Sequence, residues 1–136
     1  MTDDFAITIY HNPDCGTSRN TLAMIEAAGY RPTVVEYLVA GWTRSLLERL
    51  LDAMAMRPRD LLREKGTPAA ELGLLDPATG DDAILEAMIA HPILVNRPIV
   101  VTPRGTRLCR PSETVLALLD RVPDQFTKED GEVVRL

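Results

Sequence analysis

One cysteine lies in a stretch whose composition suits an activated thiolate. Residues 10–19 read Tyr-His-Asn-Pro-Asp-Cys-Gly-Thr-Ser-Arg, with Cys15 just after an Asn-Pro turn. An apolar, β-rich run over residues 6–10 precedes the turn, and helical spacing begins near Ser18. Cys15 is therefore predicted in a strand-to-helix loop, where free N–H groups and the helix dipole favour thiolate over thiol. The same groups suit an oxyanion, so the stretch predicts a nucleophile beside an anion site.

The number and spacing of the cysteines limit the other chemistry that they could perform. Cys15 and Cys109 form neither a CxxC motif nor a cluster with histidine, so the ligands of a zinc site are absent and no metal is expected. Cys109 alternates with Arg107 in an expected strand and is interpreted as structural. A disulfide stays open on sequence alone, although a reducing cytoplasm disfavours one. Ser18 stands where CxxC has its second cysteine, so redox chemistry at Cys15 needs an external thiol.

A βαβ unit is expected to position the loop. Residues 33–38 form the second strand, so the strand, helix and strand that begin the chain make a parallel pair. The helix between them presents Leu22, Ile25 and Ala28 on one face. A further helix over residues 44–54 is capped by Thr43, and its buried stripe is Leu47, Leu50 and Leu51.

The second half contains a helical insertion and then two strands. Short helices are expected at 59–63 and 70–74, and a longer one at 84–90 capped by Asp81. Residues 99–101 form the third strand, and a turn leads into its hairpin partner at 106–109. A last helix opens near 112, with Val115, Leu118 and Leu119 facing inward. The tail from Asp124 shows no clear pattern.

This order, β-α-β, helical insertion, β-β-α, predicts one α/β domain over residues 1–136. It resembles the thioredoxin-like fold, a four-stranded mixed sheet with flanking helices, with a helical insertion at about 41–91 between strands 2 and 3. Thioredoxin-like proteins carry their reactive cysteine after the first strand and a proline, often cis, before the third. Cys15 and Pro98 stand at those places, so a cis Arg97–Pro98 bond is expected.

Composition excludes several classes of function. Fifteen basic residues against twenty acidic ones give a net charge of −5, which argues against nucleic-acid binding but not against a small anion. No apolar run approaches the roughly 20 residues that span a membrane. The start, Met1-Thr2-Asp3-Asp4, lacks the basic residues of a signal peptide. We expect a soluble cytoplasmic protein.

Four segments closely resemble one enzyme family. They are 11–22 with His-Asn-Pro-Asp-Cys-Gly-Thr-Ser-Arg, 91–103 with Asn-Arg-Pro, 105–113 with Cys-Arg-Pro-Ser, and 126–131 with Phe-Thr-Lys-Glu-Asp-Gly. These segments are similar to bacterial arsenate reductases of the glutathione/glutaredoxin-coupled class. The phosphatase-type arsenate reductases, with their C-x5-R loop, are not matched, because Arg19 comes four residues after the cysteine.

The resemblance implies a function and a site. Arsenate would be reduced to arsenite through a cysteine–arsenic adduct, with glutathione as co-substrate, glutaredoxin as partner and no bound cofactor. It implies Cys15 as the nucleophile, supported by His11 and Ser18. The arginines that it implies for oxyanion binding are Arg63, Arg97 and Arg110.

Alternatives stay open for most of these residues. Arg63 alone is typical of a solvated helix charge, His11 of a turn cap and Ser18 of a helix N-cap. Asp14 would raise the pKa of the neighbouring thiol. We interpret the other nearby arginines as surface or supporting residues: Arg19, Arg104 and Arg107.

Two other functions also stay open. A related glutathione-dependent thiol reductase would not act on arsenate, and retention of the three arginines argues against it. A redox-sensing transcription regulator of the same fold would use CxxC, which is absent here.

Overall fold

The computed structural model describes residues 5–135. The chain divides into two compact units, which are described separately below. The sheet unit is Met1–Glu36 with Arg97–Leu136, and the helical unit is Tyr37–Asn96. The predicted insertion, 41–91, falls inside the helical unit, while the single domain over residues 1–136 stays a prediction.

A four-stranded mixed sheet with the order β2-β1-β3-β4 forms the sheet unit. Strand β1, Thr8–His11, pairs in parallel with β2, Thr33–Glu36, and antiparallel with β3, Ile99–Thr102. Strand β4, Gly105–Leu108, pairs antiparallel with β3. This confirms the predicted α/β class and the parallel βαβ unit. The Arg97–Pro98 bond before β3 is cis, as expected, and so is Arg110–Pro111.

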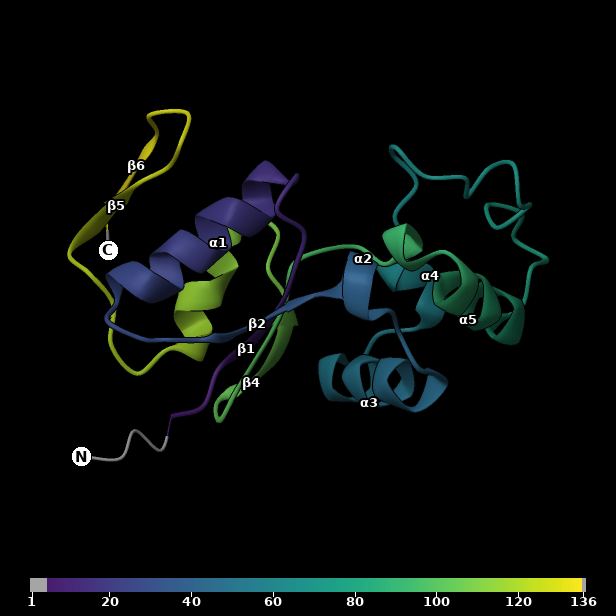
Figure 1. The fold of residues 1–136 in the computed structure, drawn as a ribbon, viewed down its shortest axis with the longest axis horizontal. Coiled ribbons are helices and arrows are strands. Elements are labelled where there is room, and N and C mark those ends of the chain that lie inside the picture. The colour runs from purple at the N-terminus through teal and green to yellow at the C-terminus, as the bar shows by residue number, and fades with distance from the viewer. Residues whose placement is uncertain (1–4, 136) are drawn as a thin grey trace. The chain divides into compact units, whose positions relative to one another are not determined.

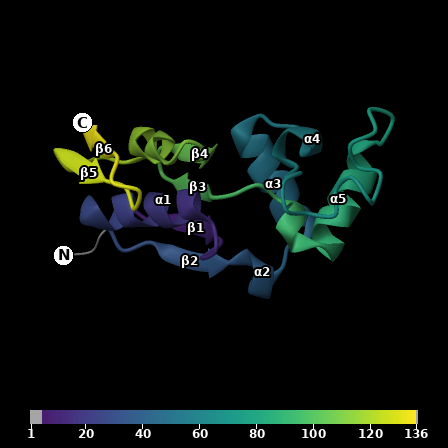
Figure 2. The ribbon, with the colours of Figure 1, turned by 90° about the horizontal axis from the view of Figure 1, so that it is seen from above.

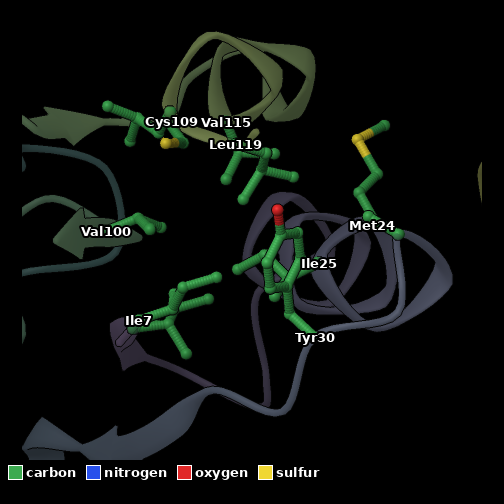
Figure 3. Close-up of a cluster of buried hydrophobic side chains, with 11 residues drawn as sticks. Ile7, Met24, Ile25, Tyr30, Val100, Cys109, Val115 and Leu119 are labelled. Carbon is green, nitrogen blue, oxygen red and sulfur yellow. The ribbon is translucent and has the colours of Figure 1, made fainter. Parts of the chain in front are cut away.

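Two helices pack against each other beside this sheet, as Figures 1 and 2 show. They are α1, Gly16–Ala27, and the 3-10 helix η2, Ser112–Leu118. Their apolar side chains meet those of the sheet in one buried cluster (Figure 3), whose members are Ile7, Ile9, Met24, Ile25, Ala28, Tyr30, Val100, Cys109, Val115, Leu118 and Leu119. Leu22 lies only partly buried at its margin, so the buried face of α1 is rotated from the predicted one, toward Met24.

A C-terminal hairpin completes the sheet unit and was not predicted. Strand β5, Gln125–Thr127, pairs antiparallel with β6, Val133–Arg135. The two strands lie beside α1 in both views of the ribbon (Figures 1 and 2). The sequence pattern that could predict these strands is weak, because each strand has three residues and only its middle residue is half-buried.

Short helices build the helical unit: α2, Tyr37–Ala40; α3, Arg44–Met54; α4, Pro58–Leu61; α5, Asp81–Ala90; and the 3-10 helix η1, Pro92–Leu94. The predicted α3 is confirmed in full, with Thr43 Oγ1 accepting the Leu46 N–H at 3.2 Å. Its predicted stripe, Leu47, Leu50 and Leu51, is buried. No helix among residues 5–135 is long and apolar enough to cross a membrane.

Three predictions in this region were wrong. Strand β2 ends at Glu36 because the next residues turn into α2, closed by the Gly41 N–H on the Tyr37 carbonyl at 2.8 Å. Residues 70–74 form turns instead of a helix, since Gly73 takes a φ of 73° that breaks helical geometry. Helix α5 is capped by Gly80, so Asp81 lies inside its first turn, where its charge complements the helix dipole.

Helix α3 ends at a position whose backbone conformation suits glycine better than the alanine that occupies it. Ala55 has a left-handed φ of 55°, which the Cβ of alanine disfavours by roughly 1 kcal/mol. We expect Ala55→Gly to raise the free energy of unfolding by about 0.5–1 kcal/mol in urea titrations. Ala53→Gly, inside the same helix, is the control and should lower it by about 1 kcal/mol. Equal losses in both variants would contradict the assigned helix end.

Candidate active site

Cys15 is the N-cap of α1. Strand β1 ends at His11, and the Asn12 carbonyl accepts the Cys15 N–H at 3.0 Å, closing the turn between strand and helix. The Cys15 carbonyl in turn accepts the Arg19 N–H at 3.0 Å, the first hydrogen bond of the helix. The predicted place of the cysteine is therefore confirmed. The reading of Ser18 as N-cap was wrong, because the helix begins earlier, at Gly16.

The register of the sheet brings two of the predicted arginines to this loop. Tyr10 near the end of β1 pairs with Ile99 at the start of β3, so Arg97 lies close to the end of β1. Ile99 also pairs with Leu108 at the end of β4, which places Arg110 beside Arg97. Accordingly, Arg110 Nη1 donates to the Arg97 carbonyl at 2.9 Å and lies 3.7 Å from the Cys15 sulfur.

The ionisation of Cys15 depends on its burial and on the hydrogen-bond donors near its sulfur. The side chain is 8% exposed, and this burial raises the pKa of the thiol. The Ser18 backbone N–H and the guanidinium groups of Arg97 and Arg110 act in the opposite direction and outweigh it. The pKa of Cys15 therefore lies below its ordinary value, so the thiolate forms more readily than in a free cysteine.

His11 and Ser18 form a buried pair behind the loop. His11 Nδ1 lies 2.6 Å from Ser18 Oγ, which also accepts the Asn12 N–H at 3.1 Å. Burial lowers the pKa of His11, opposed by the nearby charge of Glu36, so the imidazole favours its neutral form. Ser18 Oγ therefore accepts the Asn12 N–H and can donate its own hydroxyl proton in the tautomer whose Nδ1 carries no hydrogen. The pair thus holds the loop and Ser18, whose backbone N–H is one of the groups that lower the pKa of Cys15.

Arg63 belongs to the helical unit. Its N–H donates to the Leu94 carbonyl at 2.7 Å, beside the bridge between Leu62 and Val95, and its Nε donates to the Lys65 carbonyl at 3.3 Å. Its backbone is therefore fixed within that unit. The predicted contact of Arg63 with substrate stays a prediction.

Asn12 supports the Cys15 loop, and the sequence did not single it out as a site residue. It is 2% exposed, and its Oδ1 accepts the Asp14 N–H at 2.9 Å. With its carbonyl on Cys15, it holds both ends of the turn before the nucleophile. The Asn-Pro-Asp sequence could have predicted this turn, because asparagine side chains commonly accept a hydrogen bond from the backbone two residues on.

Cys109, Arg19 and Arg104 have structural surroundings. Cys109 is fully buried in the sheet-unit core (Figure 3), and burial raises the pKa of its thiol to about 12. This confirms its interpretation as structural. Neither cysteine forms a disulfide. Arg19 pairs with Glu129 and Arg104 with Asp120, as expected of supporting residues. Within residues 5–135, no group of three or more potential ligands could hold a metal ion.

Removing the Ser18 hydroxyl would strand buried polar groups. We expect Ser18→Ala to lower the free energy of unfolding by about 1–3 kcal/mol, since the Asn12 N–H and His11 Nδ1 lose their buried partner. Chemical denaturation measures this loss. Thr17→Ala, one residue earlier in α1, is the control and should change stability by less than about 0.5 kcal/mol. A Ser18 variant as stable as its control would contradict the network.

Removing Arg110 should raise the pKa of Cys15, because one donor to the thiolate disappears. We expect Arg110→Gln to slow alkylation by iodoacetamide at pH 7 roughly tenfold and to shift its pH profile upward. Cys109 stays silent because its pKa is about 12. Arg104→Gln, whose guanidinium pairs with Asp120 at 3.2 Å, is the matched control. An unchanged profile for Arg110→Gln would exclude this role.

Comparison with known proteins agrees with this geometry. The arsenate reductase ArsI1 of Synechocystis sp. is 58% identical to the chain, over 98% of this chain and 93% of that protein. An arsenate reductase of Rhizobium meliloti is 60% identical over 94% and 92%. A solved arsenate reductase structure from Vibrio cholerae superimposes with a TM-score of 0.81 at 40% identity, over 86% of this chain and all of that one. Residues 10–118 match the ArsC family, and the chain belongs to it.

Proposed function

We propose that this chain reduces arsenate to arsenite, with Cys15 as the nucleophile and glutathione and glutaredoxin as the source of electrons. The observation that carries the proposal is the Cys15 thiol, whose pKa is lowered by donors that would also neutralise an oxyanion. Membership of the ArsC family and the identity to arsenate reductases support the same substrate.

Arsenate carries negative charge that the site must offset before a thiolate can approach. Arg97 and Arg110 lie next to Cys15, and the first N–H groups of α1 are free of helical partners. Guanidinium groups bind tetrahedral oxyanions through paired hydrogen bonds. Arg63 is proposed as a third cation at the substrate, which would spread the charge over three groups.

The proposed reaction proceeds in three steps. The Cys15 thiolate attacks arsenic and forms an S–As bond, while one As–OH group takes a proton from solvent and leaves as water. A glutathione thiolate then attacks the Cys15 sulfur, and the electrons of the S–As bond stay on arsenic, which leaves as arsenite. Glutaredoxin finally takes the glutathione from the mixed disulfide and restores the Cys15 thiolate.

Dependence on an external thiol follows from the second cysteine. Cys109 is fully buried and its pKa is about 12, so it is poorly suited to attack a disulfide or an arsenic adduct. Glutathione and glutaredoxin maintain reduced thiols in the cytoplasm, which is where we place the reaction. His11 and Ser18 are proposed to act through the loop geometry, by holding the turn at Asn12 and the first turn of α1 around Cys15.

The proposal is tested with purified protein, arsenate, glutathione and glutaredoxin, by following NADPH consumption through glutathione reductase. Cys15→Ser should reduce turnover to background, and Cys109→Ala should retain most of it. Mass spectrometry after turnover should find one glutathione on Cys15 and none on Cys109. Turnover without arsenate, or full activity in Cys15→Ser, would contradict the function.

A binding measurement separates arsenate reduction from general thiol reduction. Cys15→Ala should still bind arsenate in a titration, and adding Arg97→Gln should weaken that binding roughly tenfold, because one charged donor is lost. A Cys15→Ala protein without any affinity for arsenate would favour a thiol reductase that does not act on arsenate.

A further inference from the structure

The turn of the C-terminal hairpin contacts both segments that carry the site. Lys128 and Glu129 are neighbours at the end of β5, and their side chains bind two different elements. Glu129 binds α1 just after Cys15, and Lys128 binds η2 just after Arg110.

Glu129 holds Arg19 with both carboxylate oxygens. Arg19 Nε donates to Oε2 at 2.9 Å and Nη2 donates to Oε1 at 2.8 Å, while the Glu129 N–H donates to Asn20 Oδ1 at 3.1 Å. The remaining nitrogen, Arg19 Nη1, donates to the Pro13 carbonyl at 2.7 Å. The guanidinium thus connects the hairpin to the turn that precedes Cys15, and its charge is neutralised by Glu129.

Lys128 makes the corresponding contact with η2. Its Nζ lies 2.7 Å from Glu113 Oε1, and Glu113 also accepts the Ser112 hydroxyl at 3.0 Å. The Lys128 and Glu113 side chains are 12% and 29% exposed, so this pair is better shielded from solvent than Arg19 and Glu129 at 44% and 47%. Glu113 follows Arg110 by only three residues.

We propose that the C-terminal hairpin positions the site: Glu129 keeps Arg19 on the Pro13 carbonyl, and Lys128 fixes the segment that carries Arg110. The two contacts hold the turn before Cys15 and the start of η2 to the same hairpin. Arg19 is a positioning residue here, since its three donor groups are already used within the protein. The effect on Cys15 is indirect and passes through the turn.

Removing the charge of Glu129 separates positioning from a direct electrostatic effect, because the two predict opposite changes in the stability of the Cys15 thiolate. If the hairpin did not position the turn, neutralising Glu129 would leave the positive Arg19 unopposed near Cys15 and would favour the thiolate. Positioning predicts the opposite, because a displaced turn moves the Cys15 sulfur away from Arg110 Nη1, which lies 3.7 Å from it.

The test measures Cys15 alkylation by iodoacetamide against pH in the full chain. Glu129→Gln removes the negative charge and replaces one carboxylate oxygen with an NH2 group, which would face a donor nitrogen of the Arg19 guanidinium. We expect alkylation at pH 7 to slow roughly twofold to fivefold, the range that an exposed ion pair sustains. Asp130→Asn removes the same charge one residue later, and its side-chain oxygen can still accept the Glu132 N–H, so it should alkylate at the parent rate. Unchanged or faster alkylation in Glu129→Gln would overturn the proposal.

Two further variants separate positioning from simple attachment of the hairpin. Arg19→Lys keeps a charge that can pair with Glu129, but a single ammonium group cannot also hold the Pro13 carbonyl, so alkylation should slow as in Glu129→Gln. The double variant should be no slower than either single one, because both remove the same contact. Parent-like alkylation in Arg19→Lys, or additive losses in the double variant, would overturn the proposal.

Lys128→Met tests the second contact. Its control is Arg135→Met, because Arg135 Nη1 donates to Gln125 Oε1 inside the hairpin, at 3.3 Å. Slower alkylation is expected in Lys128→Met alone, and equal rates in the two variants would remove Lys128 from the proposal. The inference rests on Cys15 as the nucleophile of the proposed function. Alkylation uses neither arsenate nor glutathione, so its result stands or fails separately from arsenate reduction.

Discussion

Stabilisation of a buried thiolate is the interaction on which the rest of the site depends. Burial of Cys15 by itself raises the pKa of its thiol, so reactivity requires donors that offset the loss of water. The Ser18 N–H is available as a donor because α1 begins at Gly16 and the first N–H groups of a helix have no helical acceptor. The point at which the helix starts is therefore part of the chemistry, and the Asn12 turn fixes that point.

Strand topology supplies the remaining donors. Because β3 runs antiparallel to both β1 and β4, the end of β1, the start of β3 and the end of β4 meet at one edge of the sheet. Arg97 and Arg110 extend from two of these ends, and the loop to Cys15 extends from the third. Small shifts in register would separate the three groups, so the pairing of β1 and β3 matters for function as well as stability.

The sequence was informative where local pattern and strand order decide the structure. Apolar periodicity predicted the sheet, and the β-α-β, β-β-α order then placed Cys15 and Pro98 at the site, whereas Arg97 and Arg110 came from the resemblance to arsenate reductases. The C-terminal hairpin was not predicted, because its strands have three residues each and little apolar alternation. Its attachment through Glu129 to Arg19 joins residues more than a hundred positions apart. No local propensity reports such a contact, and it becomes visible only when the helix and hairpin are placed together.

The two cysteines show why burial alone does not set reactivity. Both are at most 8% exposed, yet the pKa of Cys15 is lowered while that of Cys109 is raised to about 12. Cys109 lies in an apolar cluster, and the charge of Arg107 does not offset the effect of this burial on the pKa of the thiol. Cys15 has a helix N–H and two guanidinium groups around it. A chain with one ionisable and one silent thiol cannot form an internal disulfide readily, and a mixed disulfide with a small thiol is then the natural product of oxidation at Cys15.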